Sequence, residues 1–133
     1  MNWRRWTFCA SSVLIAAISL RYFISDSNTV EHQAQRLGSR VFTVEAWAKA
    51  SDVERGEMTA SFLRQHDVKR LSNKQIEKLL GHPTAYYYQD TTPAYVVGPK
   101  TVSSEFADGY LWVFQASLYD GQIDQVFFVP EVK

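Results

Sequence analysis

The chain has little cysteine and lacks the short motifs that mark common enzyme classes. Its single cysteine, Cys9, excludes an intramolecular disulfide and any multi-cysteine metal site. Patterns such as Gly-x-Ser-x-Gly, His-Glu-x-x-His and the phosphate loop are missing, and the 3 histidines are far apart in the sequence. We therefore predict a protein that is not an enzyme, with no catalytic residue, no metal and no cofactor.

An excess of charge of either sign is also missing. The 14 Lys and Arg residues balance the 14 Asp and Glu residues, so the formal net charge is +0. Domains that bind nucleic acid carry a basic excess, and we predict no nucleic-acid partner. With 133 residues, 46% of them hydrophobic and 21% charged, the composition is that of one globular domain.

Charge is absent from one long apolar run, which extends from Trp6 to Leu20. Two arginines precede this run, and Arg21-Tyr22-Phe23-Ile24 follows it. This order predicts a signal anchor or signal peptide over residues 1–24, with residues 6–24 in contact with membrane lipid. Cys9 lies inside the run rather than at its end, so we interpret it as a buried apolar side chain and not as a lipidation site.

The arginine pair Arg4-Arg5 sets the expected orientation, because positive charges before an apolar run are retained in the cytoplasm. We predict a single-pass protein of the bacterial inner membrane, with its C-terminal domain in the periplasm. The alternative is a cleaved signal peptide, for which Ala17-Ile18-Ser19 offers small residues at the required spacing. Cleavage there releases the domain into the periplasm as a secreted protein.

Residues 25–40 are polar and lack a sustained apolar stripe, so we predict a tether there, part of it a helical stalk over residues 29–37. The folded domain is expected over residues 41–133. Its first helix follows Thr43 and carries Val44, Trp47 and Ala48 on one face.

Two capping boxes mark the next helices, because in each a serine is followed three residues later by Glu or Gln. The first begins at Ser51, but Gly56 weakens it and favours a helix over residues 57–66, with Met58 and Phe62 facing a sheet. The second begins at Ser72. It ends where Gly81 supplies the left-handed position after the last turn.

After Pro83 the sequence is rich in aromatic and β-branched residues, which predicts strands over residues 84–89, 94–97, 110–118 and 122–129. Asp120-Gly121 predicts a two-residue hairpin between the last two strands. The resulting register pairs, on the core side, Leu118 with Ile123, Ala116 with Gln125, Phe114 with Phe127 and Trp112 with Val129. The opposite face is half apolar, and we expect residues 90–108, or else a partner, to cover it.

Three short segments resemble a known family of small bacterial envelope proteins. They are Leu79-Leu80-Gly81-His82-Pro83, Tyr95-Val96-Val97-Gly98-Pro99, and Leu111-Trp112-Val113-Phe114 leading to Asp120-Gly121-Gln122-Ile123. Together with Trp47, Arg55, Met58 and Leu63, they look like an uncharacterised branch of the BamE family, also called SmpA or OmlA. The resemblance covers residues 44–129.

The resemblance implies an α+β fold, with two or three short helices packed on a three- to four-stranded antiparallel sheet. It also implies a non-catalytic role in binding or scaffolding at the cell envelope, with an envelope protein as the unidentified partner. Two departures limit the transfer: the lipidation signal of the best-known member is missing here, and Leu71-Ser72-Asn73 replaces its glycine-methionine turn. The resemblance carries over no functional residue beyond framework positions.

Tyrosines are the residues most typical of a recognition surface in this chain. Tyr86, Tyr87 and Tyr88 are consecutive, and alternate residues of a strand point to opposite sides, so at least one of them is outside. Tyr86, Tyr88 and Tyr95 are the candidate partner-binding surface; cross-strand stabilisation of the sheet is the competing interpretation.

The first functional hypothesis is an interaction or scaffold domain held at the membrane. The alternatives are a small enzyme or ligand-binding protein released by signal cleavage, and an inhibitor-like module. The sequence leaves the oligomeric state open.

Overall fold

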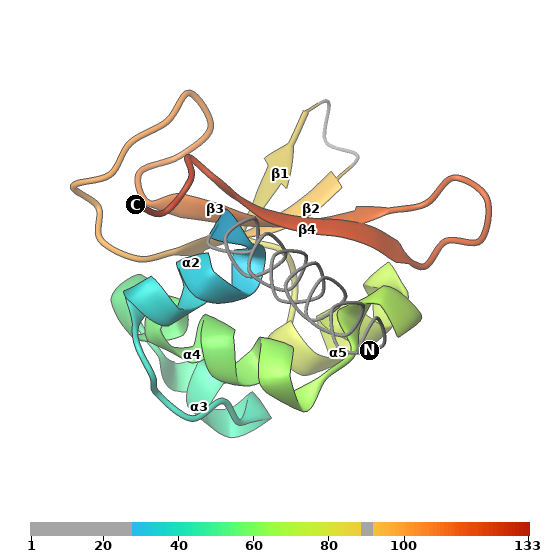
Figure 1. Cartoon of the computed structure of the whole chain (residues 1–133), viewed down its shortest axis with the longest axis horizontal. Coiled ribbons are helices and arrows are strands. Elements are labelled where there is room, and N and C mark those ends of the chain that lie inside the picture. The colour runs from blue at the N-terminus through green and yellow to red at the C-terminus, as the bar shows by residue number, and fades with distance from the viewer. Residues whose placement is uncertain (1–27, 89–91) are drawn as a thin grey trace, which may run out of the picture.

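The computed structural model describes residues 28–88 and 92–133, and it confirms the predicted α+β class. In the described residues, four antiparallel strands form one sheet in the order β1-β2-β3-β4, and the helices gather on one side of it (Figure 1). The helices are α2 (Val30–Leu37), α3 (Val44–Lys49), α4 (Asp52–Gln65), the short 3-10 helix η3 (Val68–Arg70) and α5 (Asn73–Leu80). The strands are β1 (Ala85–Tyr87), β2 (Thr92–Val97), β3 (Tyr110–Ala116) and β4 (Ile123–Val129).

The helix starts follow the predicted caps. Both capping boxes are present: the hydroxyl of Ser51 accepts from the N–H of Glu54, and that of Ser72 accepts from the N–H of Gln75. Helix α5 ends at Gly81, whose φ of 79° is in the left-handed region that glycine adopts without strain. These local signals therefore place α5 correctly at both ends, whereas α4 begins at the Ser51 capping box rather than at residue 57, the start that the sequence favoured.

Helix α4 is longer than predicted, because Gly56 does not interrupt it. A Cβ atom at this position would lie 3.0 Å from the backbone nitrogen of Gly98, at the end of β2. That backbone N–H also donates to the carbonyl of Asp52, at 2.7 Å. Because Gly56 has no side chain, helix α4 can approach the backbone at the end of β2 closely, and the helix continues through this residue.

The described part of the expected tether, residues 28–40, is packed into the domain. Ala34 of α2 is fully buried in the main core, and the side chain of Gln33 accepts a hydrogen bond from the N–H of Val132 at 3.0 Å. Val30, Ala34 and Leu37 recur at helical spacing, which is the signal of a packed helix. The folded domain therefore begins before residue 41, and this segment is part of it rather than a tether.

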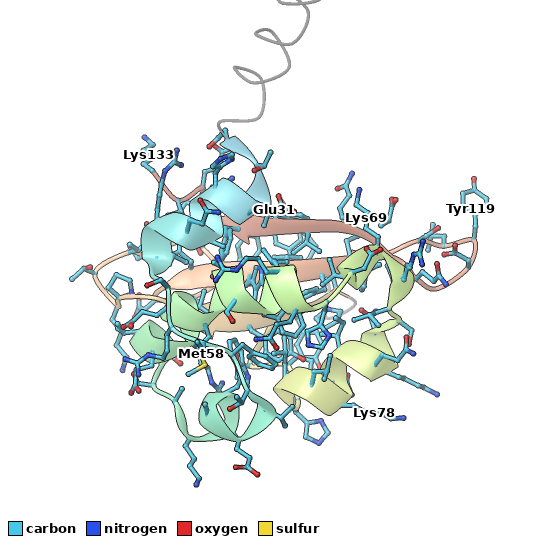
Figure 2. All side chains as sticks on the ribbon, turned by 60° about the horizontal axis from the view of Figure 1, so that its bottom comes forward. Glu31, Met58, Lys69, Lys78, Tyr119 and Lys133 are labelled. Carbon is cyan, nitrogen blue, oxygen red and sulfur yellow. The ribbon has the colours of Figure 1, made fainter. Side chains whose placement is uncertain are left out.

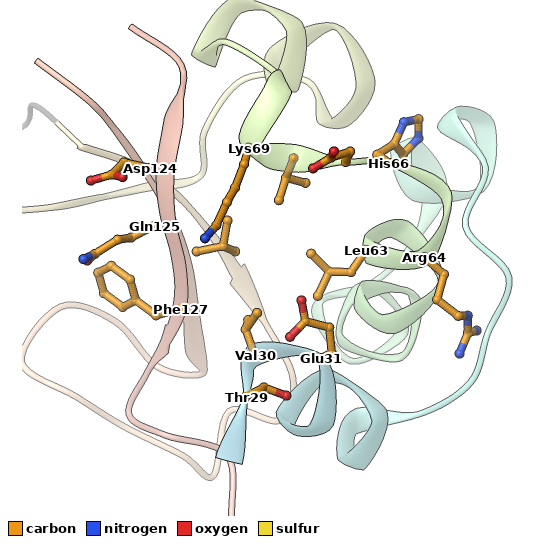
Figure 3. Close-up of a pocket in the computed structure, with 13 residues that line it drawn as sticks. Thr29, Val30, Glu31, Leu63, Arg64, His66, Lys69, Asp124, Gln125 and Phe127 are labelled. Atoms are coloured by element: carbon orange, nitrogen blue, oxygen red, sulfur yellow. The ribbon is translucent and has the colours of Figure 1, made fainter. Parts of the chain in front are cut away.

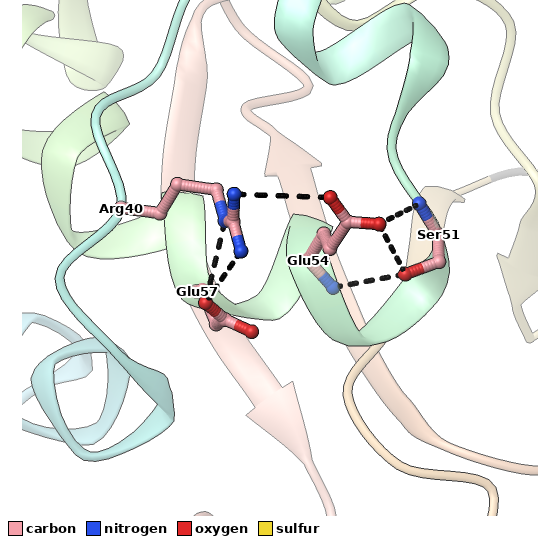
Figure 4. A network of polar contacts seen from close by, with 4 residues as sticks. All are labelled: Arg40, Ser51, Glu54 and Glu57. Atoms are coloured by element: carbon pink, nitrogen blue, oxygen red, sulfur yellow. Dashed lines mark hydrogen bonds and ion pairs between the residues drawn. The ribbon is translucent and has the colours of Figure 1, made fainter.

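Arg40 fastens the chain between α2 and α3 to helix α4 (Figure 4). Its guanidinium pairs with Glu57 at 3.2 Å and with Glu54 at 3.8 Å, and its backbone N–H donates to the carbonyl of Glu57. Glu54 also accepts hydrogen bonds from the hydroxyl and the N–H of Ser51, which hold the pKa of its carboxyl below the ordinary value. These exposed ion pairs orient the segment and add little free energy.

The predicted register of the last two strands is wrong by one residue. Trp112 pairs with Phe128 rather than with Val129, and the pairing shifts again at an irregularity between Gln115 and Ala116. Trp112 still faces the helices, where its ring stacks with Phe128 at a centroid distance of 6.1 Å.

The hairpin turn is longer than the predicted two residues. Ser117 and Gln122 close it, with the N–H of Ser117 donating to the carbonyl of Gln122 at 2.8 Å. Tyr119 is fully exposed at the tip of this turn (Figure 2). Leu118 is also fully exposed instead of lying over the core. Leu118 therefore does not pair with Ile123.

Each face of the sheet has an apolar cluster. The main cluster lies between sheet and helices and contains, among others, Trp47, Phe62, Tyr95, Trp112 and Phe114. The second cluster, on the opposite face, is built on Ala94, Leu111 and Val113, with Tyr87, Phe106 and Phe127 packed against it. Phe106 belongs to the loop between β2 and β3, within the predicted segment 90–108, so the chain's own loop contributes to the cover of this face, as one of the two alternatives predicted.

Candidate functional site

The three tyrosines of the predicted partner-binding surface do not form one surface. Tyr95 is fully buried in the main core, and its hydroxyl donates to the carbonyl of Gly81 at 2.8 Å. Burial raises the pKa of the Tyr95 phenol well above its ordinary value. Its role is to tie β2 to the end of α5, so the prediction of Tyr95 as a contact residue is wrong.

Tyr86 and Tyr88 are exposed, at 47% and 58%, but on opposite faces of the sheet. Tyr86 pairs with Pro93 and so shares the helix-facing side with Tyr95. Tyr88 has a φ of 51°, which turns its ring toward the other face, 4.4 Å from Tyr87 and 5.3 Å from Phe106.

A cavity of about 790 Å³ lies on a different side of the molecule, beside the edge strand β4 (Figure 3). We call it the β4 groove. Helix α2, the end of α4, the segment of η3 and strand β4 enclose it. Its lining residues are Thr29, Val30, Glu31, Leu63, Arg64, His66, Asp67, Val68, Lys69, Asp124, Gln125, Val126 and Phe127.

The floor of the β4 groove is aliphatic. Val30, Leu63, Val68 and Val126 come from four different elements, and all four are partly buried against the main core. They carry no hydrogen-bonding group in their side chains. A ligand could therefore contact this apolar surface while the residues of the main core stay in place.

Two opposite charges border this floor. Lys69 of η3 and Glu31 of α2 extend into the groove from opposite walls, whereas Arg64 and His66 point away from it (Figure 3). Among the described residues, ion pairs join Arg40 to Glu54 and Glu57, and Arg70 to Asp67. Lys69 and Glu31 take part in none of them.

The outer edge of β4 is tied to the rest of the domain only near its two ends in the part of the chain that the structure describes. At its start, the N–H of Ile123 donates to the carbonyl of Leu71 at 2.8 Å. Beyond its end, Gln33 and Arg36 hydrogen-bond the backbone of Val132. The strand between these ties borders the groove and has β3 as its one strand neighbour.

A second, smaller cavity of about 320 Å³ lies at the end of α5. The indole of Trp47 donates to the carbonyl of Leu80 at 2.9 Å, and Arg55 lies over the same ring at 4.9 Å from its centroid. Arg55 also donates to the carbonyl of Trp47. These contacts hold the joint between α3, α4 and α5, because the Trp47 indole satisfies a free carbonyl at the end of α5 and Arg55 of α4 binds a carbonyl of α3.

The sequence did not indicate the β4 groove. Its residues lie in four segments between residues 29 and 127, and they share no motif. The available signal was the apolar spacing of α2, which shows that Val30 belongs to a packed helix.

The described residues contain no group of three or more His, Cys, Asp or Glu side chains arranged to hold a metal ion. Within residues 28–88 and 92–133, no helix has the length and apolar character needed to cross a membrane. Comparison of the chain with protein-family models, with curated proteins and with solved structures found no match.

Proposed function

We propose that this chain is a non-catalytic interaction domain, held at a bacterial inner membrane by residues 1–24, that binds an extended segment of a partner protein in the β4 groove. The observation that carries the proposal is an open groove with an aliphatic floor beside an edge strand. An edge strand presents unpaired N–H and C=O groups, and an extended peptide uses them as a further strand. Main-chain pairing supplies affinity, and the groove accepts side chains.

Membership of the BamE family, in the branch described above, is part of the same proposal. It is supported by the order of helices followed by antiparallel strands, and by the end of α5 at Leu80-Gly81. The family resemblance agrees with a role in binding rather than catalysis.

The position of the groove agrees with a partner close to the membrane. Thr29 and Val30 line the groove, and only residues 25–28 separate them from the expected anchor. Four extended residues reach at most about 14 Å. A partner segment in the β4 groove is therefore expected at or near the membrane surface.

Photo-cross-linking in cells tests the proposal. A photoreactive residue at Lys69 or Glu31, whose side chains extend into the groove (Figure 3), is expected to capture one protein, with the cross-link mapped to an extended segment of it. Val126→Asp, which places a charge on the groove floor, is expected to abolish this capture. The matched control positions are Tyr86 and Tyr88 at the other edge of the sheet. Capture at the tyrosines with none at the groove would show that the partner binds elsewhere.

A further inference from the structure

Lys69 and Glu31, whose side chains extend into the β4 groove, lie in a defined order along strand β4. The other charged lining residues do not face the groove floor in this way: Asp67 pairs with Arg70, Arg64 points away, and Asp124 points to the side of β4 on which Gln125 and Phe127 lie (Figure 3). Lys69 belongs to η3, which is next to the start of β4, where Leu71 accepts from the N–H of Ile123. Glu31 belongs to α2, which is next to the end of β4, where Gln33 binds the backbone of Val132. A ligand lying along β4 thus meets a cation, then the aliphatic floor, then a carboxylate.

An added strand presents alternate side chains to the same side of the sheet. Val126 faces the helices and forms part of the groove floor, whereas Phe127 packs on the opposite face against Tyr87 at a ring distance of 5.3 Å. A bound peptide therefore directs every second side chain into the groove. Three such side chains span about 13 Å along the strand. The part of the peptide that the groove can recognise is therefore one apolar residue and the nearest groove-facing residue on each side of it.

We infer that the occupant of the β4 groove is an extended partner segment with the pattern basic-x-apolar-x-acidic, read from N to C, added antiparallel to β4. This inference rests on the proposed function. In the antiparallel direction the basic residue meets Glu31, the apolar residue meets the aliphatic floor, and the acidic residue meets Lys69. All strand pairs of the described sheet are antiparallel, which is the slightly more stable pairing per residue.

A second copy of this chain fits the groove less well. If two β4 strands paired edge to edge, each groove would receive the segment Ile123–Val129 of the other copy. This segment contains Asp124 but no basic residue to meet Glu31. In such a pair, the Glu31 carboxylate of each groove would have no cation from the other copy to bind.

The chain's own residues 20–27 also have the wrong order of charges. A strand running back along β4 from Asn28 would bring Asp26 toward Glu31 and Arg21 toward Lys69. Like charges would meet at both ends of the groove. The charges therefore favour a segment of another protein.

The test uses the full-length chain in lipid nanodiscs and two fluorescein-labelled peptides that differ only in charge order. The matching peptide is GSKTVTESG and its control is GSETVTKSG; binding is followed by fluorescence anisotropy at low salt. The matching peptide gains two exposed ion pairs where the control meets two like charges, so we expect the matching peptide to bind about five- to tenfold more tightly. The double variant Glu31→Lys/Lys69→Glu is expected to reverse this preference, with its fold checked by circular dichroism.

The outcomes separate this inference from the proposed function. If both peptides bind equally and Val126→Asp blocks both, the charge pattern is wrong while binding in the groove stands. If neither peptide binds, or Val126→Asp changes nothing, both the inference and the groove as binding site fail. The inference is also overturned if the control peptide binds more tightly, if chains cross-link to each other through β4, or if peptide binding appears only after deletion of residues 20–27.

Discussion

Strands β1 and β4 are the two edges of one sheet, but they differ in length and in what lies beside them. β1 has three residues, and the rings of Tyr87 and Tyr88 pack with Phe106 of the chain's own loop. β4 has seven residues, and its outer edge borders a groove with an aliphatic floor. The comparison teaches that the loop residue Phe106 packs on the sheet face beside the short edge strand β1, while the longer edge strand β4 borders a groove whose floor residues share no sequence motif.

The largest expected effect distinguishes a buried tyrosine from an exposed one. Tyr95→Ala removes a fully buried ring and its hydrogen bond to Gly81, and we expect a loss of about 3–5 kcal/mol in the free energy of unfolding. Tyr86→Ala, near the β1 edge, should cost under about 1 kcal/mol. Urea denaturation followed by tryptophan fluorescence measures both. Equal losses would mean that Tyr95 is no more buried than Tyr86.

The closure of the β1 side by the loop is tested at Phe106. Phe106→Ala removes a half-buried ring that lies 5.1 Å from Tyr87, and we expect a loss of about 1–3 kcal/mol together with increased binding of a hydrophobic dye. Glu105→Ala, at the exposed neighbouring position, is the control. An unchanged stability of Phe106→Ala would show that the loop does not hold the β1 side closed.

The raised pKa of Tyr95 predicts a loss of stability in alkali. Unfolded tyrosine ionises near pH 10.0, whereas folded Tyr95 stays neutral to higher pH because it is buried. The free energy of unfolding is therefore unaffected by this group below pH 10 and falls above it, by about 1.4 kcal/mol per pH unit.

Denaturation curves between pH 9 and pH 11.5 check this slope. Tyr95→Phe lacks the ionisable group, so its stability is expected to start about 1 kcal/mol lower and to fall less steeply. Parallel curves for the two proteins would count against a buried, neutral Tyr95.

The smallest effect is expected at the hairpin tip. Leu118 and Tyr119 are fully exposed there, so Leu118→Ser/Tyr119→Ser should change the free energy of unfolding by no more than about 0.5 kcal/mol. Under the two-residue turn expected from the sequence, Leu118 covers the core, and the same change would cost several times more. The comparison of the two denaturation midpoints decides between the registers.

The failure of the register prediction has an identifiable cause. Asp120-Gly121 is a favoured pair for a two-residue turn, yet Asp120 uses its carboxylate to accept from the N–H of Gln122, at 3.0 Å. At the same time Ser72 bridges to Gln122, next to the bond between Ile123 and Leu71. Contacts to a segment fifty residues earlier in the chain thus fix where β4 begins, and local turn chemistry does not contain that information.

The sequence by itself determined the class of fold, the two capping boxes, the glycine end of α5 and the approximate positions of the four strands. These features depend on neighbours within a few residues, so caps and hydrophobic periodicity report them directly. Only the tertiary structure decided that Tyr95 is buried and that Val30, Leu63, Val68 and Val126 meet beside β4. The physical reason is that buried sites and grooves form where segments distant in the sequence pack together, and the local pattern of one segment does not specify which other segment packs against it.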